Sequence, residues 1–535
     1  MKKKMLDPVG VYATYSDLFG YKYDKTQLIK LLHQMPLGSL LNILSQLNSI
    51  ELEKTSIRKG FISFLQDKIS DSSFLIDRIG DRLLYTPQGL LSVWKWLLAY
   101  GDWNKINVQI DLDSGIIFIL YLHLIVSDYL HEENNTDLLY DFFSNVNFNS
   151  SNDAGASLAR ACIMYEEIAR ETSLFNPKEF MDINSSFLGK YGYTIKEYLS
   201  IVFAIHTSFI VEGGNIKVSG ARSIEHFSNF SLIEKFEVIM NELSMTIEDA
   251  RSWAEANIDR SWNYQLFKEK PLLKMENGFY LCISLNFLFE QVFNQLFFKI
   301  RECFPKDSEQ IISFIGRCFE NYVDIITKEA AKLSPVPYEI ISEFKFGSNS
   351  SPDCMIKLGD KIIAIESKNR RMKLDSLINS KPETIHFDLE KMIENPLLQL
   401  YGCIKKLIER NHPVLQGVRD IYLVVVTQGS IATLPPFIQE INDRLFNLFE
   451  IPIKSIHHLD IEEYEWLLAI AFKKGASPIF NVLDNKTKLA PVSSFRNFAF
   501  KNCYSKKRLK FLNGKFLQHT NDFGQMLVGD QWKAE

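Results

Sequence analysis

The sequence lacks the short motifs that identify several large enzyme classes. It contains no GxxxxGK[ST] phosphate-binding loop, no HExxH zinc-binding helix and no GxSxG nucleophile elbow. Each of these motifs carries a particular chemistry at a fixed spacing. We therefore do not expect ATP-driven translocation by this chain alone.

Cysteine is scarce, and its spacing is irregular. Seven cysteines are scattered singly, without a CxxC pair: Cys162, Cys282, Cys303, Cys318, Cys354, Cys403 and Cys503. An odd number without paired spacing argues against a disulfide framework and against a zinc ribbon. The pattern indicates a protein of the reducing cytosol, so we expect a cytoplasmic location.

Long apolar runs are missing as well. The longest, over residues 115–126, falls short of the roughly 20 residues that a membrane-spanning helix needs. The lysines at residues 2–4 are not followed by the apolar segment of a signal peptide. We expect no membrane contact, and we predict a buried core helix over residues 115–126.

The chain has no excess of positive charge. Its formal net charge is -5 over 535 residues, so the whole molecule is not a general binder of polyanions. Any contact with nucleic acid must then come from local patches of positive charge.

The length of the chain suggests about three domains, and 46% hydrophobic residues supply ample core material.

An acidic hairpin is the most informative feature that is present. Gly359-Asp360 is a two-residue turn signal between two apolar runs, because Gly accepts the positive φ that such turns require. With these residues at the centre of the turn, Asp353 lies directly opposite Glu366, with Cβ atoms about 5 Å apart. Two such carboxylates repel each other unless a cation lies between them, and in proteins this cation is usually a divalent metal ion. Lys368 follows on the same face of the strand as Glu366.

Five residues at the open end of this hairpin resemble the motif of the PD-(D/E)xK nuclease superfamily: Pro352 and Asp353, then Glu366, Ser367 and Lys368. The resemblance covers about residues 310–475. It implies an α/β restriction-endonuclease-like core, in which helices flank a mixed central sheet. Apolar residues at helical spacing predict a large, mostly α-helical region N-terminal to this core. The expected order is a helix over 316–323, a first strand over 341–346, the hairpin, a helix over 389–408 and a buried strand over 422–427.

The resemblance also implies two site residues outside the hairpin. The first core helix of this superfamily usually carries a glutamate that faces the site, and Glu320 holds that place. A glutamine of the later helix often points toward the site, as Gln399 would. Gln399 and Tyr401 are two residues apart, so they would point to different helix faces, unlike the four-residue spacing of the RecB-type variant. Each of the two site candidates could instead be an ordinary polar helix residue.

The roles that the resemblance implies are those of a metal-dependent phosphodiesterase. Asp353, Glu366 and the Ser367 carbonyl would bind Mg²⁺, with Mn²⁺ as an alternative ion. Glu320 would reach the metal through water or help to hold a second ion. Lys368 would orient the attacking water, and products would carry 5′-phosphate and 3′-hydroxyl ends.

Basic residues in two places could contact the phosphates of a nucleic acid. Arg370, Arg371 and Lys373 directly follow the motif, and Lys506, Lys507 and Arg508 belong to a basic segment of the C-terminal tail. Cationic side chains neutralise phosphates without reading the base sequence. Either group could instead be a solvated surface.

We predict five regions along the chain. Apolar residues at helical spacing indicate helices in the N-terminal half, and a polar loop over 145–153 divides it. The regions are two helical segments over 1–150 and 151–265, a hairpin with a connecting helix over 266–300, a nuclease domain over 301–480 and a basic tail over 481–535.

The sequence therefore predicts a metal-dependent nuclease whose helical half recognises a target, a partner or a trigger. DNA is favoured over RNA as the substrate and endonuclease action over exonuclease action, and family analogy suggests restriction or antiphage defence. Expected partners are nucleic acid and a second copy of the chain or another protein. The alternatives are an RNA-cutting nuclease and a non-catalytic module that binds nucleic acid or protein. The intact set of two acids and a lysine argues against the non-catalytic module.

Overall fold

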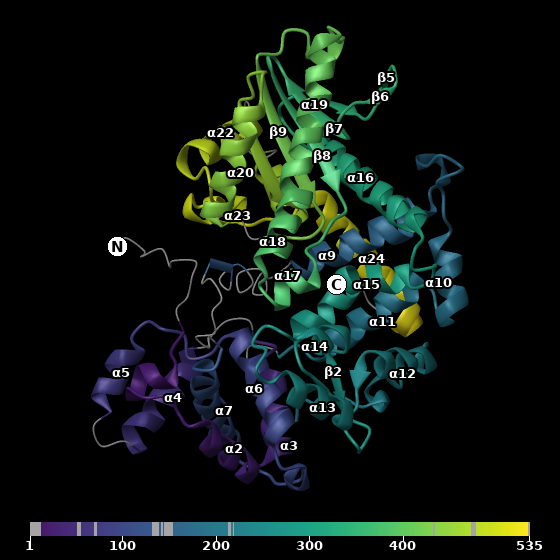
Figure 1. Cartoon of the computed structure of the whole chain (residues 1–535). Coiled ribbons are helices and arrows are strands. Elements are labelled where there is room, and N and C mark those ends of the chain that lie inside the picture. Colours follow the sequence, from purple (N-terminus) through teal and green to yellow (C-terminus); the bar gives the residue numbers. More distant parts are fainter. Residues whose placement is uncertain are drawn as a thin grey trace. The chain divides into compact units, whose positions relative to one another are not determined.

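The structure is a computed structural model and describes residues 12–50, 55–68, 72–130, 139–140, 143, 153–211, 216–217, 219–431, 434–471 and 478–532. It is mixed α/β with a helix-rich N-terminal region, which confirms the coarse fold class (Figure 1). Among the described residues, no helix combines the length and the apolar character needed to cross a bilayer.

The chain divides into two compact units. Unit 1 comprises residues 1–135, 197–296 and 523–535, and unit 2 comprises residues 136–196 and 297–522. These units group residues 136–196 with the C-terminal sheet and divide residues 481–535 between them, whereas the predicted regions separate the chain at residues 150, 265, 300 and 480. Local composition cannot show this, because residues distant in sequence join the segment to its unit. An example is the buried ion pair of Arg160 and Glu465, at 2.9 Å.

Unit 1 consists mainly of helices around a small sheet. The helices are α1 (Tyr15–Phe19), α2 (Lys25–Gln34), α3 (Leu37–Leu47), α4 (Thr55–Lys68), α5 (Ser73–Ile79), α6 (Pro87–Tyr100), α7 (Leu112–Ser127), most of α11 (Ile195–Ser208), α12 (Ile233–Glu242), α13 (Ile247–Asn257), α14 (Gln265–Glu269) and most of α15 (Leu285–Arg301). Helix α7 contains the apolar run, and its buried face confirms the predicted core helix.

The sheet of unit 1 contains the predicted second hairpin. Strands β2 (Leu272–Lys274) and β3 (Tyr280–Cys282) pair antiparallel, and β1 (Ser244–Met245) pairs parallel to β2. Gly278 has a φ of +78° in the connecting turn, and Asn277-Gly278 is a sequence typical of such hairpin turns. The predicted polar loop over 145–153 lies almost entirely outside the described residues.

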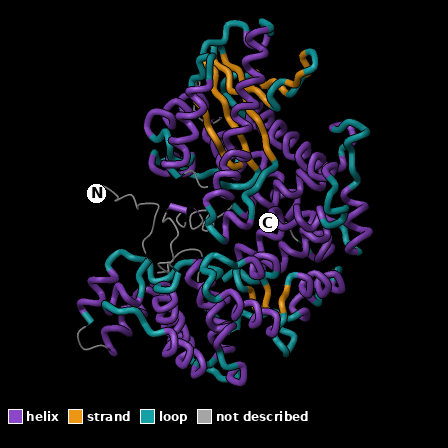
Figure 2. The backbone as a smooth tube through the Cα atoms, in the orientation of Figure 1, coloured by secondary structure: helices purple, strands orange, loops and turns teal. Residues whose placement is uncertain are grey.

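Unit 2 is built on a five-stranded mixed sheet. Its strand order is β10 (Ser455–Asp460), β9 (Asp420–Thr427), β8 (Lys361–Lys368), β7 (Cys354–Leu358) and β4 (Glu339–Ser342), and Figure 2 shows these strands side by side. Strand β7 pairs antiparallel with both β4 and β8, whereas β8, β9 and β10 run parallel to one another. The first core strand is shorter than predicted over 341–346, because the chain leaves the sheet after β4 and forms the small hairpin of β5 (Lys345–Phe346) and β6 (Asn349–Ser350).

The register of the acidic hairpin is the predicted one. Cys354 pairs with Ile365, and Leu358 pairs with Lys361 across the turn. Gly359 has a φ of +60°, which an L-residue adopts only at a cost. The turn signal therefore fixed which residues of β7 and β8 face each other.

Helices pack against this sheet. The helices of unit 2 are α9 (Ala154–Cys162), α10 (Ile183–Tyr191), α16 (Glu309–Lys332), α17 (Leu374–Ile378), α18 (Pro382–Leu389), α19 (Asn395–Glu409), α20 (Pro435–Leu448), α21 (Ile461–Ala471), α22 (Pro478–Leu489), α23 (Phe495–Lys501) and most of α24 (Lys510–Val528). Among those that pack against the sheet are α16, α19, α21 and α22. A π-helical turn at Glu390–Glu394 joins α18 to α19, so the helix predicted over 389–408 has a break near its start.

One face of the sheet forms a core with α18, α19 and α20. Buried residues of the strands, among them Met355, Ala364 and Leu423, pack against apolar residues of these helices, and Figure 1 shows α19 lying along the sheet. Helix α16 contacts β4 and β8. The observed order of helix, hairpin, helices and buried strand is the predicted one, and it brings α16 and α19 to the open end of the hairpin.

Replacing the turn glycine tests the origin of the register. We expect Gly359→Val to lower the free energy of unfolding by about 1–2 kcal/mol, because its left-handed backbone places Cβ against the following carbonyl. Chemical denaturation measures the change. Gly316→Ala in α16 is the control: an added Cβ meets nothing within 4 Å there, and alanine favours a helix by about 0.5–1 kcal/mol. Equal stability of Gly359→Val and the wild type would show that this turn does not set the hairpin.

Candidate active site

The open end of the hairpin brings the three motif residues together. The Ser367 N–H donates to Asp353 Oδ2 at 2.7 Å, and Lys368 Nζ donates to Glu366 Oε1 at 2.6 Å. Asp353, Glu366 and Lys368 line the same cavity. The structure therefore places these side chains as the register of the hairpin predicts.

The backbone of Ser367 is directed toward Asp353. The carbonyl of Lys368 accepts the N–H of Gln428, which continues the next strand, at 3.1 Å. Successive residues of a strand direct their backbone groups to opposite sides, so the N–H and C=O of Ser367 lie on the β7 side. The Ser367 carbonyl is thus available on the side of the two acids, as its predicted role requires.

A third acid extends the row across the sheet. Ser342 pairs with Cys354, and the N–H of the next residue, Glu343, donates to the Asp353 carbonyl at 3.1 Å. Glu343, Asp353 and Glu366 therefore stand at the same level of three adjacent strands. Sequence reasoning missed Glu343, because it predicted a first strand over 341–346 without a register between that strand and the hairpin. The pairing of Ser342 with Cys354 is what brings Glu343 beside Asp353.

Helix α19 contributes the predicted glutamine. Gln399 Nε2 donates to Glu366 Oε1 at 2.7 Å. Tyr401 points elsewhere: its hydroxyl accepts the N–H of Glu450 at 2.7 Å, and its ring stacks on Phe449 at 4.2 Å. Gln399 and Tyr401 therefore point to different faces of the helix, as their spacing predicts.

Helix α16 contributes Glu320 and an arginine that sequence reasoning missed. Arg317 Nη1 is 2.7 Å from Glu320 Oε2 and 2.8 Å from Glu343 Oε2. The spacing of three residues between Arg317 and Glu320 was the available signal, since such residues share a helix face. Glu320 therefore lines the cavity, as predicted, but its direct partner is a guanidinium.

These residues surround one cavity of about 480 Å³. It is lined by Arg317, Glu320, Glu343, Asn349, Ser350, Ser351, Asp353, Glu366, Lys368, Leu398, Gln399, Gly402, Cys403 and Lys406. Four of these side chains are carboxylates and three are cations, and one of the cations, Lys406, donates to Asn349 at 3.0 Å. The acids thus exceed the cations in a confined space.

The excess of acids affects their protonation. Burial raises the pKa of Asp353 well above its usual range, and the charges of Glu366 and Glu320 raise it further. Burial also raises the pKa of Glu320 to about 7 and raises the pKa of Glu366. The side chains of this cavity alone therefore do not supply enough positive charge to keep all the acids ionised at neutral pH.

The residues fit a divalent cation by their chemistry. Within the described parts of the chain, no three His, Cys, Asp or Glu side chains form a ready metal-binding group. Asp353, Glu366 and the Ser367 carbonyl nevertheless offer the oxygen ligands that Mg²⁺ prefers, and Mg²⁺ usually keeps several waters and binds only one or two carboxylates. A divalent ion would also offset the charge that raises the pKa values of the acids.

The basic residues predicted to follow the motif differ in their surroundings. Arg370 and Lys373 are exposed, and Lys373 Nζ lies 3.6 Å from the centre of the Phe387 ring. The guanidinium of Arg371 lies 4.3 Å from the Phe297 ring, with its Nε and Nη2 atoms buried. The expectation that Arg371 contacts phosphate is therefore not supported, because an aromatic side chain covers its charge.

The predicted basic residues of the tail are largely neutralised. Lys506 Nζ lies 3.4 Å from a Glu462 carboxylate, and Arg508 Nη2 lies 2.7 Å from Asp153. Lys507 is exposed. Two of these three cations have acidic partners, which weakens the case for a phosphate-binding patch.

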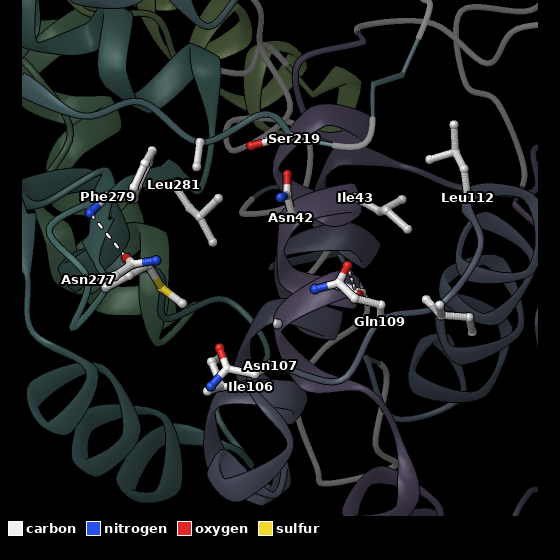
Figure 3. Close-up of a pocket in the computed structure, with 15 residues that line it drawn as sticks. Asn42, Ile43, Ile106, Asn107, Gln109, Leu112, Ser219, Asn277, Phe279 and Leu281 are labelled. Carbon is white, nitrogen blue, oxygen red and sulfur yellow. Dashed lines mark hydrogen bonds between the residues drawn. The ribbon is translucent and has the colours of Figure 1, made fainter. Parts of the chain in front are cut away.

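Unit 1 contains a cavity of a different character, shown in Figure 3. It measures about 250 Å³ and lies between α3, the loop that precedes α7 and the β2–β3 hairpin. Amide side chains such as Asn42, Gln109 and Asn277 line it together with apolar residues, and none of its lining residues is charged. It lacks the groups for metal binding or proton transfer, so the acidic cavity of unit 2 is the candidate active site.

Comparisons with known proteins do not add to this assignment. No protein-family model, no curated protein and no solved structure matches the chain.

The protonation of Glu320 makes a pH-dependent contribution to stability. A carboxyl whose pKa rises from 4.5 to about 7 on folding binds more protons in the folded state over that interval. The contribution of Glu320 to stability in metal-free buffer therefore falls as pH rises from about 4.5 to about 7. We expect Glu320→Gln to make this fall smaller, as measured by denaturant unfolding in EDTA across this range. An unchanged pH dependence in the variant would contradict the raised pKa.

Proposed function

We propose that this protein is a metal-dependent nuclease of the PD-(D/E)xK type, with a restriction-endonuclease-like core in unit 2. The observation that carries the proposal is the convergence of Asp353, Glu366 and Lys368 with Gln399 in one acidic cavity. Two acids and an ammonium at this spacing match the requirements for hydrolysis of a phosphodiester bond. The order of strands and helices around them supports the same assignment.

The side chains have distinct roles in this proposal. Asp353, Glu366 and the Ser367 carbonyl hold the Mg²⁺ or Mn²⁺ ion, which when bound polarises the scissile phosphate and promotes ionisation of the attacking water. Lys368 orients that water from its position beside Glu366 and offsets charge that develops on the phosphate. Gln399 fixes the Glu366 carboxylate by donating to the same oxygen that Lys368 contacts.

The substrate and setting rest on the resemblance of the motif. We propose DNA as the substrate before RNA, endonuclease action, and a role in restriction or antiphage defence. Unit 1 is the proposed recognition part, because its cavity has no charged lining and its helices carry no catalytic motif. An overall charge of -5 means that such a protein needs a specific contact to bring a polyanion to its site.

Substitution of the motif residues tests the activity directly. We expect Asp353→Asn and Lys368→Ala to lower the rate of cleavage of circular and linear DNA in Mg²⁺ by at least about 100-fold. The reason is that each removes a group assigned to the reaction. Melting temperatures should change little, since both side chains lie at the open end of the hairpin rather than in its core.

Matched controls lie at the closed end of the same hairpin. Asp360→Asn and Lys361→Ala make the same chemical changes at the turn, outside the cavity, and should keep wild-type rates. Assays with RNA and assays with EDTA run in parallel. Full cleavage by the Asp353 and Lys368 variants would exclude the assigned roles. A wild type that binds nucleic acid and cuts neither DNA nor RNA would identify the alternative, a non-catalytic binding module.

A further inference from the structure

Arg317 lies between two acids of the candidate active site. Its Nη1 atom is 2.7 Å from Glu320 Oε2 and 2.8 Å from Glu343 Oε2. Glu343 adjoins Asp353 through the backbone hydrogen bond between β4 and β7. Arg317 thus supplies positive charge to the part of the cavity beside Asp353, where a second metal ion would otherwise serve.

The remainder of the guanidinium is open to a ligand. Both contacts use Nη1, and within the described residues Nε and Nη2 of Arg317 make no hydrogen bond. The side chain is 36% exposed and lines the cavity together with Asp353 and Lys368. A planar guanidinium with free N–H groups matches the oxygens of a phosphate group.

We propose that Arg317 is a catalytic phosphate-binding residue that takes the place of a second metal ion. This inference rests on the proposed function. Glu320 and Glu343 hold the guanidinium, and Arg317 donates to a non-bridging oxygen of the scissile phosphodiester, where negative charge grows during the reaction. The site then takes one divalent cation, at Asp353 and Glu366, and Glu320 positions Arg317 instead of binding a second ion.

The charges of the cavity support a single ion. Four carboxylates face Arg317 and Lys368, while the third cation, Lys406, donates to Asn349. With all four carboxylates ionised and all three cations counted, the cavity carries one net negative charge, which a single divalent cation is enough to offset. Without Arg317, the carboxylates of Glu320 and Glu343 would have no cation between them and could supply oxygen ligands to a second ion.

Metal-binding stoichiometry tests this inference without reference to activity. In calorimetric titrations of the full chain with Mn²⁺, we expect one ion per chain for the wild type and two for Arg317→Met. Arg317→Lys keeps a cation between the two glutamates, so it should bind one ion. Arg444→Met is the matched control, because Arg444 also bridges two glutamates, Glu394 at 2.6 Å and Glu440 at 3.2 Å, outside the cavity. It should also bind one ion.

Oligonucleotide affinity supplies the second measurement. A fluorescently labelled DNA oligonucleotide is titrated in EDTA, where no cleavage occurs. We expect Arg317→Met to bind it about 10- to 100-fold more weakly, as loss of a charge-assisted hydrogen bond implies. Arg317→Lys should lose part of the affinity because it lacks the planar fork, and Arg444→Met should match the wild type.

The outcomes separate this inference from the proposed function. A wild type that binds no Mn²⁺ and cuts no nucleic acid contradicts the proposed function. A wild type that cuts DNA but binds two Mn²⁺ ions contradicts only the role of Arg317. The role of Arg317 is also contradicted if the wild type binds one ion and a folded Arg317→Met binds one ion with unchanged oligonucleotide affinity.

Discussion

Repulsion among buried carboxylates is the constraint on which the candidate site depends. Glu343 directly follows β4, Asp353 directly precedes β7 and Glu366 lies in β8, so the three acids stand at one level, and α16 adds Glu320 to the same cavity. Burial keeps water from screening these charges fully and thereby raises the pKa of Asp353 and of Glu320. Each nearby cation or amide therefore has a recognisable partner: Arg317 contacts Glu320 and Glu343, and Lys368 and Gln399 contact Glu366. The remaining negative charge explains why a divalent ion suits the site.

The fold brings these groups together from four segments distant in sequence. The antiparallel part of the sheet aligns the three strand acids, and the crossover to the parallel strand β9 carries α18 and α19 across the face from which Glu366 projects. Gln399 lies close after the π-helical turn, and such turns frequently occur at functional sites. Helix α16 reaches the same end of the sheet with Arg317 and Glu320. Stability and function are connected here, since the core that buries Met355 and Ala364 also sets the position of Asp353 and Glu366.

The parts of this site that sequence predicted are those with a local signal. The Gly359-Asp360 turn determines the pairing of β7 with β8, and that pairing alone aligns Asp353, Glu366 and Lys368. Glu343 and Arg317 were missed because their positions depend on where β4 ends and on the orientation of α16, which no short motif encodes. The predicted phosphate contact of Arg371 is not supported for a similar reason. A run of basic residues in a sequence suggests an exposed surface, whereas an aromatic ring covers the guanidinium of Arg371. The segment 136–196 joins unit 2 through contacts such as Arg160 with Glu465, which composition cannot show.

Proton release on metal binding tests the central claim most directly. If burial and the charges of neighbouring acids raise the pKa values of these carboxyl groups, a bound ion must displace protons from them. Calorimetric titration of the full chain with Mg²⁺ near pH 6.5, in buffers of different ionisation enthalpy, counts the protons released per ion. We expect measurable release by the wild type and a much smaller release by Asp353→Asn and Glu366→Gln. Metal binding without proton release, or equal release by the wild type and both variants, would contradict the claim.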